Sequence, residues 1–549
     1  MLTAAALTVA TALALTLPAL PPIGTAFEQA VSAEDILVTA TRIAAPGPPF
    51  TPLHLAQDVH QQKRQQHACN GLARLDRLLT GGGAAAERSR VVADPRTARL
   101  AACAAAPSGA TPDGVDEKHD RACAVMVASA LAALAALCAA DAVERVQARA
   151  AATATGDDAD GIAAAAAAKA AAAALAPLRA EAVTLTRRAD ALEPRMTPRD
   201  AAAACWSARR LLGAGCAARE APALEAALER AALPFDLLPC LCALPPPDRS
   251  EIAEAVAGEI AGSGLPSVAA LVATHLLVGP MERQIPFARQ ELMTADGKKV
   301  QERRHTAWLA ESGIGALAYS GKLMAPAPLA ASDGVAAVRE ALEADTAERF
   351  DCVLCNLYPA GGEAACKWHS DPEHGSRWAL PTSVVTVGEP RRFSFRPTGG
   401  GGGDGMRHVF PLFAGDVVAM RGACQDEFEH AVLPGVGELN AGPRVSLVFK
   451  RALVAADGRR GHGLQGEGRR ARARARQQAS ESDDGSAHTA AAPAKQGAAP
   501  AKRAAAPGAA NRKAGAAKAA GAARSRGRRQ PAAAAARQQP RAPQRRTQR

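Results

Sequence analysis

The stretch TSVVTVGEPRRFSFR (382–396) decides the fold of the second half of this chain. It holds two short runs of β-branched and aromatic residues separated by a Gly-Glu-Pro turn signal, which predicts two neighbouring strands. In the second run, Phe393 and Phe395 alternate with polar residues. A period of two predicts a strand with one buried face and one solvated face.

Similar runs flank this stretch on both sides. They are CVLCNLY (352–358), RHVFPLF (407–413), DVVAM (416–420) and RVSLVFK (444–450). Several short strands separated by turn signals predict an all-β sandwich or barrel. The aromatic residues gather in the same place, since 13 of the 17 lie between Arg283 and Leu453. The sequence therefore predicts one β core in the second half of the chain.

The regions on either side of this core have a different composition. Residues 1–275 are rich in alanine and carry helix-capping patterns, so we expect an α-helical region there. Residues 454–549 hold 22 Lys+Arg, 5 Asp+Glu and no aromatic residue. Such a tail cannot bury enough apolar surface to fold, and we expect it to be disordered. The sequence thus predicts an α+β multidomain protein with its β domain at 276–453.

The net charge of +11 comes from the tail alone. Outside it the chain holds 43 basic and 49 acidic residues. This distribution excludes a uniformly basic nucleic-acid binder. Basic clusters such as RRARARAR (469–476) are typical of nucleic-acid tethers or nuclear-localisation signals. A low-complexity extension without a partner stays the alternative.

Two stretches of the helical region look alike. They are SAEDILVTATRI (32–43) and TPRDAAAACWSARRL (197–211). They are similar to helical-repeat proteins of the octotricopeptide type, which bind organellar RNA. Capped amphipathic helices of any α-domain give the same pattern, so the function of residues 1–275 stays open.

Targeting and membrane signals are weak. Residues 1–27 carry no charge, whereas a secretory signal needs a positive start and a transit peptide needs arginine. Residues 2–20 approach the length of a membrane span but are rich in alanine and threonine, so a membrane anchor is the minority interpretation. The twelve cysteines show no zinc-site spacing. We expect a monomeric intracellular protein without membrane association, in the nucleus rather than the cytoplasm, with an organelle left open.

Three potential metal ligands fall in the β core. His369 and Asp371 form an H-x-D pattern, and residues i and i+2 of a strand face the same side. His430 follows after a long excursion. Two imidazoles and one carboxylate form the facial triad that holds Fe(II) and leaves positions open for other ligands. An isolated H-x-D is usually not a metal site, and the remote histidine is what favours one here.

An arginine supports this interpretation. Arg444 lies 14 residues beyond His430, at the start of an apolar strand. Its planar fork can bind a carboxylate through two hydrogen bonds. The alternative is a charge on the strand surface. A dicarboxylate co-substrate that chelates iron through one end needs a cation at the other end, and this favours a buried arginine.

From Arg303 to Leu453 the chain resembles the AlkB family of 2-oxoglutarate- and Fe(II)-dependent dioxygenases. The pieces that carry the resemblance are YSG (319–321), CNLYPAGG (355–362), WHSDPEHG (368–375), VVTVGEPRRFSFRP (384–397), GDVVAMRGACQDEFEHAV (415–432) and PRVSLVFKR (443–451). Their order and spacing are far more specific than the H-x-D alone. The resemblance implies a double-stranded β-helix, or jelly roll, that uses Fe(II), 2-oxoglutarate and dioxygen.

The resemblance also implies roles at the cofactors. The iron ligands would be His369, Asp371 and His430. Asn356 and Tyr358 would hydrogen-bond 2-oxoglutarate, and Arg444 would anchor its distal carboxylate. The family has a second arginine six residues after the first, and that position is Lys450 here. A lysine keeps the positive charge but lacks the planar guanidinium that binds a carboxylate through two hydrogen bonds. The difference from the family is therefore expected to affect co-substrate binding.

Four further residues match the substrate side of the family's site. Glu373 matches the acidic residue that contacts the exocyclic amino group of a methylated base. Tyr319 matches a residue of the nucleotide-recognition lid, and Arg391 or Arg392 would face the substrate groove. The alternatives are a solvated turn residue for Glu373 and a core aromatic for Tyr319.

The function that the resemblance implies is oxidative demethylation of alkylated DNA or RNA, with the basic tail on nucleic-acid phosphates. Two alternatives stay open. The same iron chemistry can act on a protein or a lipid. The chain can also be a non-catalytic nucleic-acid-binding protein whose oxygenase domain has degenerated at Lys450. The sequence leaves open the choice between DNA and RNA, and the modified base.

Overall fold

A computed structural model describes residues 23–44, 54–79, 85–106, 117–154, 158–244, 265–273, 278–293, 298–319, 322–361, 363–371, 374–398, 407–434, 442–454 and 458–461. The chain divides into two units, Met1–Ala479 and Ser480–Arg549, and every described residue belongs to the first. The predicted segment 2–20 and all of the predicted tail except residues 454 and 458–461 lie outside the described residues.

Helices make up the described residues before position 232. They are α2 (Ile23–Gln29), α3 (Ala33–Ala44), α4 (His54–Leu79), α5 (Ala85–Ala93), α6 (Pro95–Ala105), α7 (Glu117–Ala154), α8 (Asp158–Ala191), the short η1 (Glu193–Arg195), α9 (Pro198–Leu212), α10 (Ala214–Glu220) and α11 (Pro222–Ala231). The helix-capping patterns expected in this region form hydrogen bonds at two sites, Ser32 and Thr197. The Asp35 amide donates to Ser32 Oγ at 3.2 Å, and the Asp200 amide donates to Thr197 Oγ1 at 3.2 Å. These bonds satisfy first-turn amides that a helix cannot pair internally.

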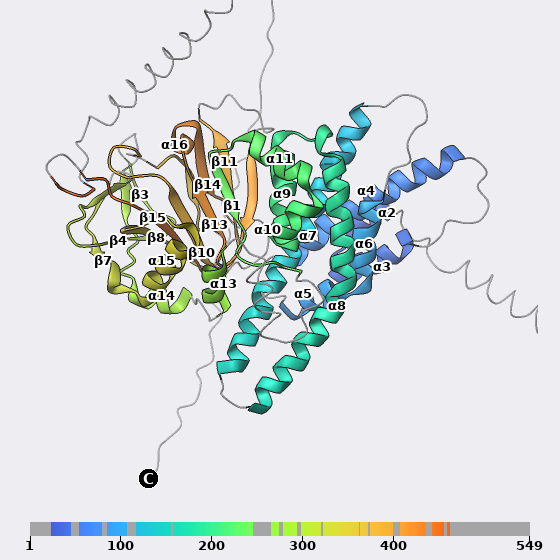
Figure 1. The fold of residues 1–549 in the computed structure, drawn as a ribbon, viewed down its shortest axis with the longest axis horizontal. Helices are drawn as coiled ribbons and strands as arrows, with labels where there is room; N and C mark the ends of the chain where they lie inside the picture. The colour runs from blue at the N-terminus through green and yellow to red at the C-terminus, as the bar shows by residue number, and fades with distance from the viewer. Residues whose placement is uncertain are drawn as a thin grey trace, which may run out of the picture. The chain divides into compact units, whose positions relative to one another are not determined.

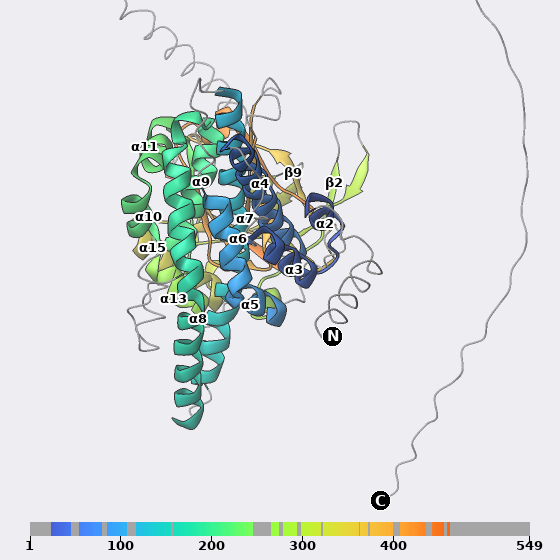
Figure 2. The same ribbon diagram turned by 90° about the vertical axis from the view of Figure 1, so that its right-hand side faces the viewer.

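The long helices pack side by side as a bundle (Figure 2). Their shared core consists mostly of alanine and leucine, and residues such as Leu72, Leu131 and Leu185 are fully buried. Part of α7 (120–148) is long and apolar enough to cross a membrane by length and composition, but 72% of its most apolar window is buried in the protein. That burial is what a core helix of a bundle shows.

Two large β-sheets form the core of the second half of the described chain (Figure 1). The strands of the seven-stranded sheet, in spatial order, are β1 (Phe235–Leu238), β13 (Val417–Met420), β10 (Thr382–Gly388), β15 (Arg444–Lys450), β8 (Cys352–Tyr358), β4 (His305–Ala310) and β7 (Ala327–Pro328). Those of the four-stranded sheet are β12 (His408–Leu412), β11 (Arg391–Pro397), β14 (Phe428–Val432) and β9 (Cys366–His369). Phe395 of β11 and Tyr358 of β8 belong to one buried cluster, so the two sheets share a core. This arrangement is consistent with the predicted jelly roll.

The alternation predicted for β11 is largely confirmed. Phe393 and Phe395 are buried, and Arg392 on the other face is exposed. Ser394 differs from the expectation, because it is fully buried although it lies on the outer face. Its hydroxyl donates to the His408 carbonyl at 2.8 Å. This hydrogen bond satisfies the polar group where solvent cannot.

Smaller elements complete this half. They are α13 (Pro266–Ala273), α14 (Val278–Gln284), η2 (Leu329–Ala331), α15 (Asp333–Thr346), α16 (Cys424–Glu427) and the hairpins β2 (Glu291–Met293) with β3 (Lys299–Gln301) and β5 (Leu317–Tyr319) with β6 (Lys322–Met324). Val268 of α13 and Leu342 of α15 join a second buried cluster with Val353 and Leu447 of the larger sheet. These helices therefore cover the face of that sheet that points away from the shared core.

One strand lies inside the range that the sequence predicts as helical. β1 follows α11 and pairs antiparallel with β13, with Phe235 opposite Met420, at the edge of the larger sheet (Figure 1). Next to it, Arg210 of α9 forms a bidentate ion pair with Asp416, with nitrogen-to-oxygen distances of 2.8 and 3.2 Å. The Cys240 amide also donates to Asp416, at 3.0 Å. The helical region thus supplies both a strand and a buried cation to the β core.

Removing this cation is expected to destabilise the protein. The side chains of Arg210 and Asp416 are 5% and 1% exposed, so Arg210→Met leaves a buried carboxylate without its ion-pair partner. We expect the free energy of unfolding to fall by about 3–5 kcal/mol. The exposed Arg230–Glu193 pair provides the control, and Arg230→Met should cost less than about 1 kcal/mol. Equal thermal unfolding midpoints for the two variants would contradict a structural role for the buried pair.

Candidate metal centre and co-substrate pocket

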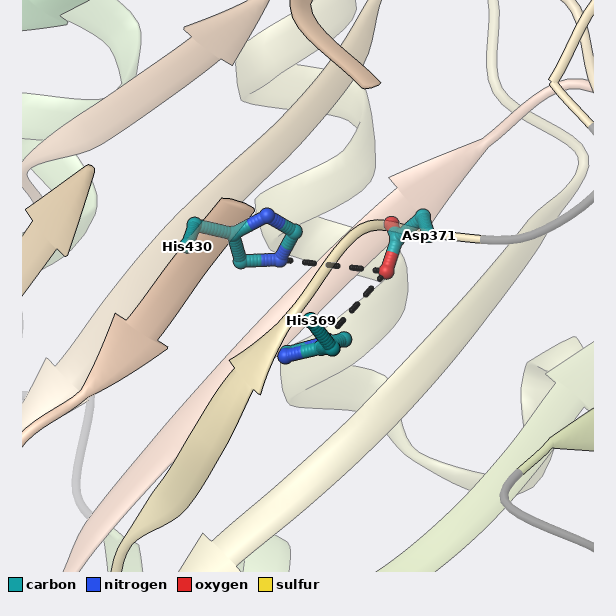
Figure 3. Close-up of side chains that lie close together, drawn as sticks. All are labelled: His369, Asp371 and His430. Carbon is teal, nitrogen blue, oxygen red and sulfur yellow. Dashed lines mark ion pairs between the residues drawn. The ribbon is translucent and has the colours of Figure 1, made fainter. Parts of the chain in front are cut away.

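The predicted metal ligands converge at one point (Figure 3). His369 ends β9 and lies opposite His430 in the register of β9 with β14, and Asp371 follows two residues after His369. Asp371 Oδ1 lies 3.6 Å from His369 Nε2 and 3.8 Å from His430 Nε2. One ligand atom from each residue falls within 4.8 Å of the others. Two imidazoles and one carboxylate at this separation fit an Fe(II) ion held on one face.

The orientation of each imidazole is fixed by its surroundings. His369 Nδ1 lies 2.8 Å from the Lys367 carbonyl oxygen, so the proton of a neutral ring sits on Nδ1 and Nε2 is left for a metal. The ring of His430 stacks on that of Phe393, with centroids 5.7 Å apart and an angle of 9° between the planes. Both histidines therefore present a nitrogen toward Asp371.

The charge states also suit a cation. Burial lowers the pKa of His430 to about 3, and His369 adds to this effect, so His430 is neutral at physiological pH. Burial alone would raise the pKa of Asp371, but Lys450 and the nearby histidines outweigh it and hold that pKa well below its usual range. The trio thus offers one carboxylate and, once His369 is deprotonated, two neutral imidazoles.

Asp371 is held from two other directions. Its amide donates to Gln425 Oε1 at 2.7 Å, and Gln425 is buried at the start of α16. Lys450 Nζ lies 2.5 Å from Asp371 Oδ2, the oxygen that does not face the two histidines. A ligand supported in this way keeps its geometry when a metal binds.

The predicted co-substrate residues lie together on β8 and β15. Arg444 is opposite Tyr358 in the register of these strands, and Asn356 is opposite Ser446. Arg444 is fully buried, and its Cζ lies 5.3 Å from the centre of the Tyr358 ring. Burial lowers the pKa of Arg444 to about 10, so the guanidinium stays charged at neutral pH.

The side chain of Arg444 is suited to an anionic ligand. Nη2 of Arg444 donates to Thr386 Oγ1 at 3.0 Å, whereas its Nε and Nη1 have no hydrogen-bond partner among the described residues. Asn356 Oδ1 is likewise unpartnered within the described part of the chain. A buried donor without a partner is costly, and a ligand carboxylate would satisfy such an arginine donor. The residues therefore fit 2-oxoglutarate with its distal carboxylate on Arg444.

Lys450 lies at the other end of the same strand. The sequence predicts it as a co-substrate residue, but its described contacts are Asp371 Oδ2 and His374 Nε2, the latter at 3.4 Å. Six residues of extended strand separate it from Arg444, roughly 20 Å. The structure thus places this ammonium group on the metal ligand, and a direct contact with 2-oxoglutarate stays a prediction.

The predicted substrate residues do not gather at one point as the predicted metal ligands do. Arg391 is buried on the inner face of β11, with Nη2 at 3.4 Å from the carbonyl oxygens of Pro359 and Gly442. Arg392 is exposed on the opposite face. The backbone of Tyr319 pairs with that of Lys322 in the β5–β6 hairpin. Glu373 lies outside the described residues.

A buried polar network beside Tyr358 is not predicted by the sequence pattern. Arg304 Nη1 lies 3.5 Å from the Tyr358 hydroxyl, and Arg304 Nε lies 3.4 Å from Glu302 Oε1. Lys322 of β6 donates to Glu302 at 2.5 Å and to Thr306 at 2.6 Å. These contacts tie the β5–β6 hairpin to β4. The pairing of β4 with β8, which brings Arg304 to Tyr358, leaves no local signal in the sequence.

The contact between Lys450 and Asp371 predicts a selective effect of Lys450→Met. Metal affinity should fall by about 10- to 100-fold, because the carboxylate loses the cation that holds its second oxygen. The affinity for 2-oxoglutarate at saturating metal should change little. Calorimetric titrations with Mn(II), and then with 2-oxoglutarate, would separate the two, with the exposed Lys299→Met as control. Unchanged metal affinity with weakened 2-oxoglutarate binding would instead support the co-substrate role.

Comparisons with known proteins agree with this geometry. Residues 273–449 match the 2OG-Fe(II) oxygenase superfamily. An uncharacterised protein of Acanthamoeba polyphaga mimivirus is 32% identical over 165 residues, which are 30% of this chain and 81% of that protein. The alpha-ketoglutarate-dependent dioxygenase alkB homolog 3 of Bos taurus is 28% identical over 173 residues, 31% of this chain and 58% of that protein. The structure of OsALKBH1 matches 31% of this chain and 88% of its own, with 13% identity and a TM-score of 0.23.

Proposed function

The chain belongs to the 2OG-Fe(II) oxygenase superfamily, with an AlkB-like oxygenase domain, and on this premise we propose that it demethylates N-alkylated bases of DNA or RNA. The observation that carries the proposal is the pairing of the His369, Asp371 and His430 cluster with the buried, partly unpartnered Arg444. The nucleic-acid part rests on the likeness to the bovine alkB homolog 3, of which this chain spans 58%.

The reaction would use the chain's residues in defined roles. Fe(II) held by the trio would supply the oxidation of a C–H bond by dioxygen, with 2-oxoglutarate converted to succinate and carbon dioxide. Arg444 would orient 2-oxoglutarate through its distal carboxylate. Lys450 keeps the second oxygen of Asp371 occupied. An N-methyl group oxidised to hydroxymethyl then leaves as formaldehyde and restores the unmodified base.

The geometry restricts the form of the substrate. The metal cluster lies between two sheets, and Asp371 and His430 are 4% and 6% exposed. A base stacked in a duplex cannot approach such a centre, so it has to be single-stranded or flipped out of the helix. Single-stranded oligonucleotides are therefore expected to be better substrates than duplexes of the same sequence.

A substrate panel tests the proposal. The full chain, loaded with Fe(II), would be given single- and double-stranded DNA and RNA oligonucleotides carrying 1-methyladenine or 3-methylcytosine, and succinate would be measured. Stimulation by a methylated oligonucleotide over its unmethylated counterpart supports the proposal and decides between DNA and RNA. Stimulation by a protein or lipid fraction alone would overturn it in favour of the same chemistry on another substrate.

A further inference from the structure

A tryptophan in contact with two arginines lies on the outer face of the four-stranded sheet. Trp368 of β9 is half-buried, and the Cζ atoms of Arg396 and Arg407 lie 4.4 and 5.0 Å from its ring centre. Both distances are within the range of cation–π contacts. Arg392 is exposed on the same face of β11. These four residues are here called the Trp368 platform.

The platform lies across the sheet from the metal cluster. On β11, Arg392 and Arg396 alternate with Phe393 and Phe395, whose rings lie against His430 with centroids 5.7 and 6.0 Å away. Trp368 directly precedes His369 on β9, which is an edge strand of this sheet. A nucleic-acid strand that crosses this edge can therefore contact the platform close to His369.

The charge of the platform is mostly uncompensated. Arg396 pairs with Glu429 at 2.6 Å, whereas Arg407 Nε donates to the Ser394 hydroxyl at 3.1 Å. Among the described residues, neither Arg392 nor Arg407 has an ion-pair partner. Outside the basic tail the protein has 43 basic and 49 acidic residues, so this is a local positive surface on an acidic body.

We propose that the Trp368 platform binds the single-stranded nucleic acid that flanks the target base, with phosphates on the arginines and a base on the indole. Arginine forks suit phosphate, and aromatic rings beside cations are the way proteins hold single strands without reading their sequence. An acidic peptide matches the charge but offers no ring to stack on Trp368. The inference deepens the proposed function and rests on its nucleic-acid substrate.

The fluorescence of Trp368 gives a readout of this binding that the basic tail does not disturb. The other tryptophans, Trp206, Trp308 and Trp378, are 3%, 2% and 1% exposed, so Trp368 is the one that a ligand can reach. The tail from residue 454 onward contains no aromatic residue. A base that stacks on Trp368 quenches its emission, whereas phosphates bound to the tail alone do not.

The test titrates an unmodified single-stranded oligonucleotide into the full-length protein at several salt concentrations. We expect saturable quenching that is lost in Trp368→Ala, with oligonucleotide affinity in that variant lowered on the order of tenfold. The double variant Arg396→Gln/Arg407→Gln should bind more weakly, with a salt dependence of log affinity that is shallower by about 1.4, since each phosphate contact on a single strand adds about 0.7. The matched control is Arg230→Gln/Arg349→Gln, which removes two exposed, paired arginines elsewhere and should leave quenching and slope unchanged.

Three outcomes would overturn the inference. They are binding without quenching, equal slopes for the platform and control variants, and equal quenching by poly-glutamate. Metal titration of each variant shows that it is folded, because the trio needs both β9 and β14 in place. Quenching by methylated DNA and RNA oligonucleotides, none of which is demethylated, refutes the proposed function and leaves the platform standing. Demethylation of an oligonucleotide that does not quench Trp368 supports the proposed function and refutes the platform.

Discussion

Arg444→Leu is expected to weaken 2-oxoglutarate binding by about 10- to 100-fold, because it removes a pair of charge-assisted hydrogen bonds worth roughly 1.5–3 kcal/mol. The protein should stay folded, since an apolar side chain of similar size replaces a cation that is buried beside the Tyr358 ring. Arg444→Lys should recover only part of the affinity, because the ammonium group has no fork. Arg444 is therefore the residue whose removal separates co-substrate binding from folding.

Thermal unfolding in the presence of Mn(II) measures this effect. Bound 2-oxoglutarate raises the free energy of unfolding by RT ln(1 + [L]/Kd), where [L] is its free concentration. The unfolding midpoint rises with it. The shift should be clear for the natural protein and much smaller for Arg444→Leu at the same concentration. An equal shift in both would mean that the distal carboxylate lies elsewhere. Arg349→Leu, which removes an exposed arginine 80% open to solvent, is the control.

His369→Ala is expected to have the largest effect on activity. It removes one of three ligands, so metal affinity should fall by more than the roughly 10- to 100-fold that loss of a supporting residue costs. Succinate formation should fall to background. His305→Ala removes a half-buried histidine of β4 outside the cluster and should leave metal binding unchanged. If His369→Ala binds metal with the same affinity as the natural protein, the three residues do not form the metal centre.

His369 is a cleaner site for this test than Asp371. Removing Asp371 also leaves the Lys450 ammonium buried without its carboxylate, at 3% exposure. The resulting loss of stability would be confounded with the loss of the ligand. If Asp371 is replaced, Lys450→Met in the same chain restores the charge balance, and the double variant should be more stable than Asp371→Ala alone.

The metal ligands and the buried arginine can be predicted from short sequence patterns. An H-x-D on a strand places both side chains on one face, and the alternation in RRFSFR predicts which face of β11 is buried. The arginine at the start of an apolar strand predicts a buried cation, and Arg444 is fully buried. These features depend on neighbours in sequence, so the sequence alone is enough to predict them.

The remaining features depend on contacts between distant segments. Lys450 reaches Asp371 across 79 positions, and Arg210 reaches Asp416 across 206. β1 pairs with β13 although it lies in the range predicted as helical, because an edge strand of four residues leaves too short a pattern to recognise. Arg304 gives no signal either, since its position depends on which strand lies beside β4. Only the three-dimensional register of the sheets brings these residues together.

The yields of succinate and formaldehyde show whether His369, Asp371 and His430 support oxidative demethylation. Succinate and formaldehyde would be quantified in the same reaction, with a methylated single-stranded oligonucleotide and either the natural protein or His369→Ala. We predict one formaldehyde for each succinate that the oligonucleotide stimulates, and neither product above background from the variant. Succinate without formaldehyde, or equal yields from the two proteins, would contradict the account.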